Sequence, residues 1–142
     1  MTIAGPETAG APEENTQGSG RYHVSLSRLA QLNRSAAHLI AARLTPACPS
    51  HGQPTNGLDP MTLIREIQEF HADTGDFIRA DMPIQEIVFR TLLSRGNAPM
   101  ALSELHRELA DRWNSALRPI SIDEERLRRV LNADTYYGFA GV

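Results

Sequence analysis

Residues 87–109, IVFRTLLSRGNAPMALSELHREL, carry two helical patterns with a break between them. The first pattern begins before this stretch, at Ile84. Its apolar side chains recur three and four residues apart, at Ile84, Ile87, Val88 and Leu92. Gly96-Asn97 is placed to end that helix, and Ser103 is a typical capping residue for the next one. The second helix would have an inner face of Leu105, Leu109 and Trp113, with Asn114 as its expected end. This stretch therefore predicts a helix, a short extended link at residues 100–102 and a second helix.

A third helix and a strand are expected after this stretch. Ser121 and Glu124 have the spacing of a capping box, which satisfies free amide groups at the start of a helix. Residues 135–142, TYYGFAGV, are aromatic and small residues of strand type, and we expect the aromatic ones to cover the core rather than to stack on bases. The predicted core consists of Leu105, Leu109, Trp113, Leu127, Leu131 and Phe139 together with Ile84, Ile87 and Val88.

The part of the chain before Pro83 is expected to divide into a tail, two helices and a loop. Residues 1–20 contain almost no bulky apolar side chains and are predicted to form a disordered tail. Helical spacing from about Ser25 to about Leu44 predicts one amphipathic helix, and the prolines and glycines of residues 45–58 predict a loop. Asp59-Pro60 is typical of a helix start, with Gly75 as a possible end. We therefore expect a helical region over residues 21–81 and a further domain over residues 82–142.

The order of elements after residue 82 resembles a winged helix. Residues 87–109 and the closing DTYYGFAGV are similar to the HARE-HTH and related winged-helix modules, and the resemblance covers less than half of the chain. It implies a mostly α-helical protein whose C-terminal domain is winged-helix-like with a short β element. It also implies a bacterial module that is DNA-associated, transcription-related or used for protein docking. A usual winged helix has two wing strands joined by a basic hairpin, whereas this sequence offers one strand after its third helix.

The composition is typical of a globular protein and excludes several catalytic motifs. With 142 residues, 41% of them hydrophobic and 22% charged, the chain is expected to fold around one core without disulfides or metal. Cys48 is the only cysteine, and neither a membrane span nor a signal peptide is apparent, so a cytoplasmic location and no membrane contact are expected. All 14 basic residues are arginine, which excludes a P-loop lysine, a Schiff-base lysine and a Ser-Lys dyad.

Basic residues on and around the third helix make it the candidate contact with double-stranded DNA. A recognition helix reaches base edges from its N-terminal half. The candidate contacts are Arg118, Arg126, Arg128, Arg129 and, on the preceding helix, His106, with help from Arg28, Arg34 and Arg43. The net charge of −3 and the acidic start of the third helix, Asp123-Glu124-Glu125, oppose this hypothesis because acidic groups repel phosphates.

Protein docking is the alternative function. In that case Leu29, Leu32 and Leu39, with Glu124 and Glu125, would bind a protein partner or a second copy of the chain. Fold-level analogy makes DNA binding the slight favourite. An enzyme is not expected, because Cys48 and His51, a nucleophile and a base close in sequence, lie in the proline loop without a third orienting group. The same pair is only a fragment of a zinc motif, so no catalytic residue, metal site or cofactor is predicted.

Overall fold

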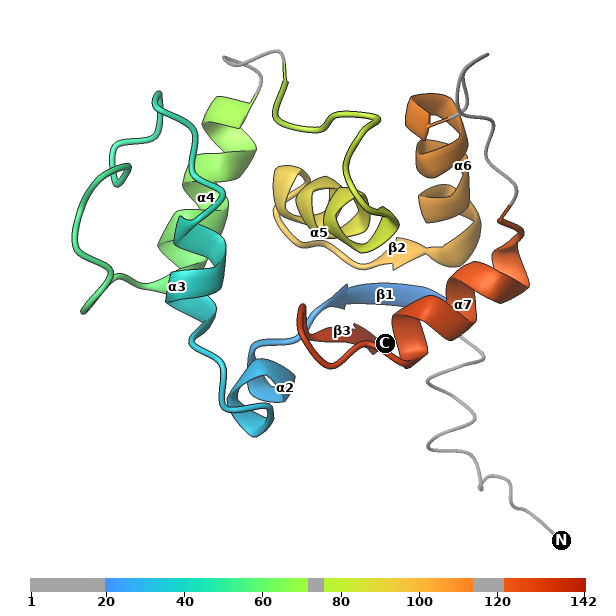
Figure 1. Ribbon diagram of the computed structural model, residues 1–142. Helices are drawn as coiled ribbons and strands as arrows, with labels where there is room; N and C mark the ends of the chain where they lie inside the picture. Colours follow the sequence, from blue (N-terminus) through green and yellow to red (C-terminus); the bar gives the residue numbers. More distant parts are fainter. Residues whose placement is uncertain (1–19, 72–75, 114–121) are drawn as a thin grey trace, which may run out of the picture.

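The computed structural model describes residues 20–71, 76–113 and 122–142, without the side chains of residues 112 and 113. These ranges form a mostly helical structure around a small sheet (Figure 1). The helices are α2 (Leu26–Gln31), α3 (Ala36–Ala41), α4 (Pro60–Phe70), α5 (Ile84–Ser94), α6 (Leu102–Trp113) and α7 (Glu124–Asn132). The strands are β1 (Arg21–Val24), β2 (Met100–Ala101) and β3 (Phe139–Gly141). None of the helices in these ranges has the length and apolar character that a bilayer span requires.

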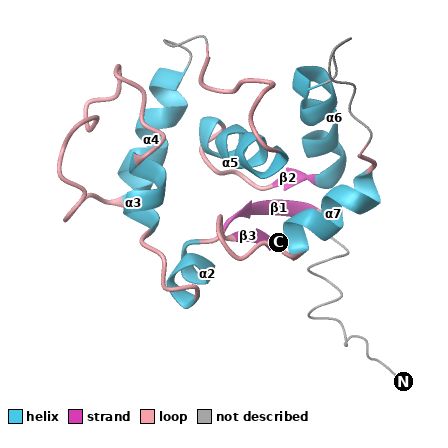
Figure 2. Ribbon diagram, in the orientation of Figure 1, coloured by secondary structure: helices cyan, strands magenta, loops and turns pink. Residues whose placement is uncertain are grey.

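The sheet joins segments that are far apart in sequence. β1 lies in the middle and pairs antiparallel with β2 on one side and with β3 on the other (Figure 2). Tyr22 is the common point of the two registers, since it lies opposite both Met100 and Gly141. Residues 21–24, which the sequence assigned to a helical region, are therefore the central strand of the sheet. Of residues 135–142, only β3 forms a strand.

The prediction of one helix over residues 25–44 is wrong, because the chain turns between α2 and α3. Asn33 has a φ of 59°, in the left-handed region that asparagine tolerates better than most residues. The amide hydrogen of Arg34 is donated to the carbonyl oxygen of Leu29, which gives α2 a Schellman-type ending. The Ser35 hydroxyl oxygen then caps α3. Apolar spacing continues across this turn, and for that reason the pattern concealed it.

Two predicted helix boundaries are confirmed. The Asp59 carboxylate accepts the Thr62 amide hydrogen, and Pro60 is the first residue of α4. At the other boundary, α5 ends just before Gly96, whose φ of 72° is strained for any residue with a side chain. Residues 45–58 contain no helix or strand, as expected of a loop. Gly75 lies outside the described residues.

The starts of the last two helices differ from the prediction. α6 begins at Leu102, so Ser103 lies within its first turn rather than at its cap. α7 is capped by Asp123, whose Oδ1 accepts the amide hydrogen of Arg126 at 2.8 Å. Ser121, the predicted cap, lies outside the described residues. The prediction named only Ser121, although aspartate is an equally good cap.

One hydrophobic core connects the helices and the sheet. α5 packs against α4, α6 and β1, while α7 packs against α6 and β3. The predicted core residues with described side chains all belong to this cluster, with Ile84 partly buried: Ile84, Ile87, Val88, Leu105, Leu109, Leu127, Leu131 and Phe139. The Trp113 side chain and Asn114 lie outside the described part of the chain. The N-terminal helices contribute Leu29, Ile40, Leu63 and Ile67 to the same cluster.

Candidate functional site

Helix α7 is held by its apolar face. Leu127 and Leu131 are both 0% exposed, and the helix packs on α6 and β3. The opposite side of the helix faces solvent, and Arg126 and Arg129 are exposed there. Because residues three apart are neighbours on a helix surface, the two guanidinium groups extend from one patch of α7.

Arg128, which lies between Arg126 and Arg129 in the sequence, has a carboxylate partner, whereas the other two have none in the described ranges. Arg128 forms an ion pair with Glu125 at 2.7 Å, one turn earlier on α7. Within the described ranges, neither the Arg126 nor the Arg129 side chain has an ion pair or a hydrogen bond. A guanidinium without a partner keeps five N–H donors in a planar fork that matches phosphate oxygens. Arg118 lies outside the described residues.

His106 is engaged with the backbone rather than free in solvent. It is half-buried on α6, and its Nε2 lies 2.8 Å from the carbonyl oxygen of Ile122. A proton on Nε2 is donated to that carbonyl. Ile122 directly precedes Asp123, the cap of α7, so this contact fixes the start of α7 against α6. The structure therefore gives His106 a positioning role at the start of α7, and its contact with phosphate stays a prediction.

The first turn of α7 is acidic and exposed. Glu124 and Glu125 follow the capping residue Asp123, and negative charges there stabilise the positive end of the helix dipole. Glu125 is partly neutralised by Arg128. The solvent face of α7 thus begins with carboxylates and continues with Arg126 and Arg129.

The leucines expected to form a docking surface lie mostly inside the protein. Leu29 is 0% exposed and Leu39 is 8% exposed, and both belong to the hydrophobic core. Leu32 is half-buried at the end of α2. These three residues do not form an exposed stripe, because the turn at Asn33 separates α2 from α3 and each helix packs its own apolar face inward.

Two of the three arginines expected to assist DNA binding form hydrogen bonds or ion pairs within the protein. Arg28 donates an Nη2 hydrogen to the carbonyl oxygen of Asp134 at 2.8 Å. Arg43 takes part in a buried ion pair. Arg34 is exposed, and its guanidinium carbon lies 4.1 Å from the centroid of the Tyr136 ring. The positive charge of residues 21–58 is therefore only partly available to a ligand.

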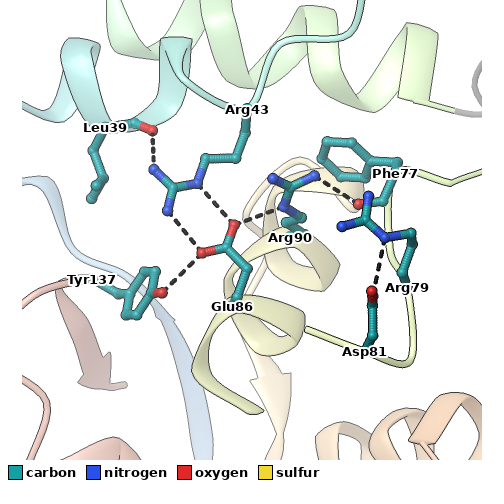
Figure 3. A network of polar contacts seen from close by, with 8 residues as sticks. All are labelled: Leu39, Arg43, Phe77, Arg79, Asp81, Glu86, Arg90 and Tyr137. Atoms are coloured by element: carbon teal, nitrogen blue, oxygen red, sulfur yellow. Dashed lines mark hydrogen bonds and ion pairs between the residues drawn. The ribbon is translucent and has the colours of Figure 1, made fainter. Parts of the chain in front are cut away.

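A buried ionic network joins three distant parts of the chain (Figure 3). Glu86 of α5 accepts hydrogen bonds from Arg43 at 2.9 and 2.8 Å, from Arg90 at 2.7 Å and from the Tyr137 hydroxyl at 2.8 Å. The Glu86 and Arg43 side chains are each 11% exposed. The sequence shows one part of this network, because Glu86 and Arg90 are four residues apart on one helix. No local pattern indicates Arg43 or Tyr137 as further partners.

The network determines the protonation of its members. Burial alone would raise the pKa of Glu86, but the hydrogen bonds from Arg43, Arg90 and Tyr137 outweigh it and lower that pKa to about 2. For Tyr137, burial and the adjacent Glu86 carboxylate both act in the same direction and raise the pKa to about 12. At neutral pH, Glu86 is therefore ionised and Tyr137 is a hydrogen-bond donor.

The end of α7 is fixed by the central strand. The buried Tyr22 of β1 donates its hydroxyl hydrogen to Oδ1 of Asn132, the last residue of α7, at 2.9 Å. Burial raises the pKa of this tyrosine, so the hydroxyl stays protonated. Together with His106 at the other end, Tyr22 sets the position of α7 relative to the sheet and to α6.

Cys48 and His51 have different surroundings. Cys48 is 3% exposed, with its Sγ 3.3 Å from the Thr45 hydroxyl oxygen, whereas His51 is exposed. In the described ranges, no group of three or more His, Cys, Asp or Glu side chains is arranged to hold a metal ion.

Comparison of the chain with protein-family models, with curated proteins and with solved structures finds no match.

Proposed function

We propose that this protein is a non-enzymatic, winged-helix-like DNA-binding protein in which α7 is the recognition helix. The observation that supports this most directly is the exposed pair Arg126 and Arg129, which has no carboxylate partner in the described ranges. The pair extends from a helix whose opposite face is buried through Leu127 and Leu131. Contacts from arginine to phosphate are charge-assisted, and phosphate contacts provide a large share of the affinity for duplex DNA.

The strand arrangement supports a winged-helix-like domain. The helices α5, α6 and α7 follow one another, with β2 between the first two and β3 after the third. A usual winged helix has a second wing strand that pairs with the first. Here β1 pairs with β3, and the amide hydrogen of Val142 is donated to the carbonyl oxygen of Arg21. We infer that residues 21–24 supply the second wing strand from the N-terminal side of the domain.

Binding to duplex DNA over a salt series tests this proposal. The logarithm of the association constant should fall linearly with the logarithm of salt concentration. Replacing Arg126 and Arg129 together with alanine should reduce the slope by about two units, since each phosphate contact contributes roughly 0.9. Arg65→Ala is the matched control, because Arg65 is an exposed arginine of α4, away from α7 (Figure 1). Wild-type protein without salt-dependent affinity would refute DNA binding, and an unchanged slope in the double variant would exclude α7 as the contact.

A second candidate function is docking to a basic protein partner or to a second copy of the chain. It is supported by the exposed Glu124 and Glu125 at the start of α7, in a chain of net charge −3. The charge reversal Glu124→Arg separates the two functions. It should tighten DNA binding, because it removes a repulsive charge beside Arg126, whereas it should weaken a complex that depends on the acidic turn. Gel-shift assays and light scattering on the same variant measure the two effects.

A further inference from the structure

An open hollow of about 170 Å³ adjoins the ionic network of Glu86. It lies between the residues that follow α3, the segment that precedes α5, and α5 itself. Its described lining includes three arginines, Arg43, Arg79 and Arg90, and one carboxylate, that of Asp76. No residue of α7 contributes to it, so the hollow is separate from the candidate DNA contact.

Two of these arginines share a single carboxylate. Arg43 and Arg90 both donate to Glu86, so this group of three carries +1, while the exposed Asp76 adds one negative charge to the lining. The third arginine, Arg79, pairs with Asp81 at 3.0 Å, but the two side chains are 51% and 72% exposed. Exposed pairs of this kind contribute little in water, so an anion can compete for Arg79 at small cost.

The guanidinium groups of Arg43 and Arg90 are fixed in place by contacts within the protein (Figure 3). Arg43 is held by Glu86 and by the carbonyl oxygen of Leu39 at 2.9 Å. Arg90 is held by Glu86 and by the carbonyl oxygen of Phe77 at 2.9 Å, and its guanidinium carbon lies 5.1 Å from the centroid of the Phe77 ring. Each guanidinium has five N–H donors, and these contacts leave some of them unused on both arginines. Because both side chains are already ordered, an anion that binds there would not have to immobilise them.

We propose that this hollow binds a small phosphate, either the free anion or a phosphate monoester, between Arg43, Arg79 and Arg90. Three guanidinium groups that approach from three segments of the chain suit a tetrahedral anion with several oxygens, since arginine pairs with phosphate in a bidentate manner. The volume of about 170 Å³ is below the roughly 300 to 1,000 Å³ of pockets for drug-sized ligands, so the hollow fits one anionic group rather than a large cofactor.

Thermal unfolding with added inorganic phosphate, and separately with phenyl phosphate, tests the proposal. Ionic strength is held constant with chloride, so that a specific ligand is distinguished from general screening. The wild-type Tm should rise with phosphate concentration, because a ligand that binds only the folded state stabilises it. Arg79→Gln should lower the affinity roughly tenfold or more, since hydrogen bonds between charged groups contribute that much. Arg79 is largely exposed, so this variant is expected to fold.

Arg95→Gln is the matched control, because Arg95 also forms an ion pair with a carboxylate, that of Glu108, but does not line the hollow. It should respond to phosphate as the wild type does. In NMR spectra, the Nε–H signals of Arg43, Arg79 and Arg90 should shift on addition of phosphate. A response to both probes supports a site for any phosphate group, and a response to one alone identifies which source it accepts.

Three results of the phosphate experiments, and one of a DNA-binding experiment, would overturn the phosphate site. The first is a wild-type Tm that responds to neither probe, and the second is an equal response in Arg79→Gln. The third is a set of NMR shifts confined to the arginines of α7. Loss of duplex DNA affinity in Arg79→Gln without a phosphate response would likewise reject the site, in favour of a contact with nucleic acid at the hollow.

Discussion

Replacing Glu86 with glutamine removes the one carboxylate that two largely buried arginines share. The pKa of Glu86 is lowered from 4.5 to about 2, and one pH unit of such a difference corresponds to about 1.4 kcal/mol. The ionised carboxylate therefore contributes about 3 kcal/mol to the free energy of unfolding at neutral pH. Removing one partner of a buried ion pair generally costs about 3 to 5 kcal/mol, because the other charge stays buried. We expect Glu86→Gln to lower the free energy of unfolding by about 3 kcal/mol at pH 7.

The loss of stability in Glu86→Gln depends on pH. Because the pKa of Glu86 is lower in the folded state, its stabilisation is fully present above the unfolded value of 4.5 and is lost as the pH falls toward 2. Urea unfolding followed by circular dichroism at several pH values measures this. The difference in the free energy of unfolding between the wild type and Glu86→Gln should be constant from pH 7 to about pH 5 and should shrink between pH 5 and pH 2.

Glu125→Gln provides a matched control, because Glu125 also pairs with an arginine, Arg128, but its side chain is 60% exposed. Exposed pairs contribute about 0 to 1 kcal/mol, so this variant should unfold almost as the wild type does. A loss of less than about 1 kcal/mol in Glu86→Gln at pH 7 would refute this role of Glu86. A difference that stays unchanged between pH 5 and pH 2 would refute it equally.

Three further predictions concern the C-terminal turn and the first strand. Tyr137→Phe keeps the ring but removes the hydrogen bond to Glu86, and urea unfolding should show a loss of about 1.5 to 3 kcal/mol. Gly138→Ala should lower the Tm by several degrees, because the glycine has a φ of 82° and an added Cβ would lie 2.6 Å from Cγ of Leu29; an unchanged Tm would contradict the geometry. Deleting residues 1–19 should leave the Tm nearly unchanged, whereas deleting residues 1–25 removes β1 and should abolish cooperative unfolding, as followed by circular dichroism.

Features encoded in a few adjacent residues could be predicted from the sequence. The start of α4 at Asp59-Pro60 and the end of α5 before Gly96 depend on backbone groups within one helical turn. The core residues of α5, α6 and α7 followed from apolar spacing. The exposure of Arg126 and Arg129 follows from the same spacing, because Leu127 and Leu131 fix which face of α7 is buried.

Features that depend on remote partners could not be predicted in this way. β1 is only four residues long, and its pairing with β2 and β3 leaves no trace in the local pattern. Helical spacing across Asn33 hid the turn between α2 and α3, and two of the three leucines predicted to dock, Leu29 and Leu39, are buried. The positioning role of His106 was missed, because the sequence does not reveal its contact with the carbonyl of Ile122.

The position of α7 depends on both local and remote contacts. These contacts determine which fragment of the chain would keep α7 in place. Its start is fixed by the Asp123 cap and by His106, and its end by the hydrogen bond from Tyr22 to Asn132. A helix held at both ends does not have to be ordered on binding, so the ordering cost is limited to its exposed side chains. Tyr22 belongs to β1, which also separates β2 from β3, so a fragment of residues 83–142 lacks both the central strand and the contact at the end of α7. We therefore expect a fragment of residues 83–142 to lose the fixed position of α7, and a protein tested for the proposed DNA binding has to include residues 20–25.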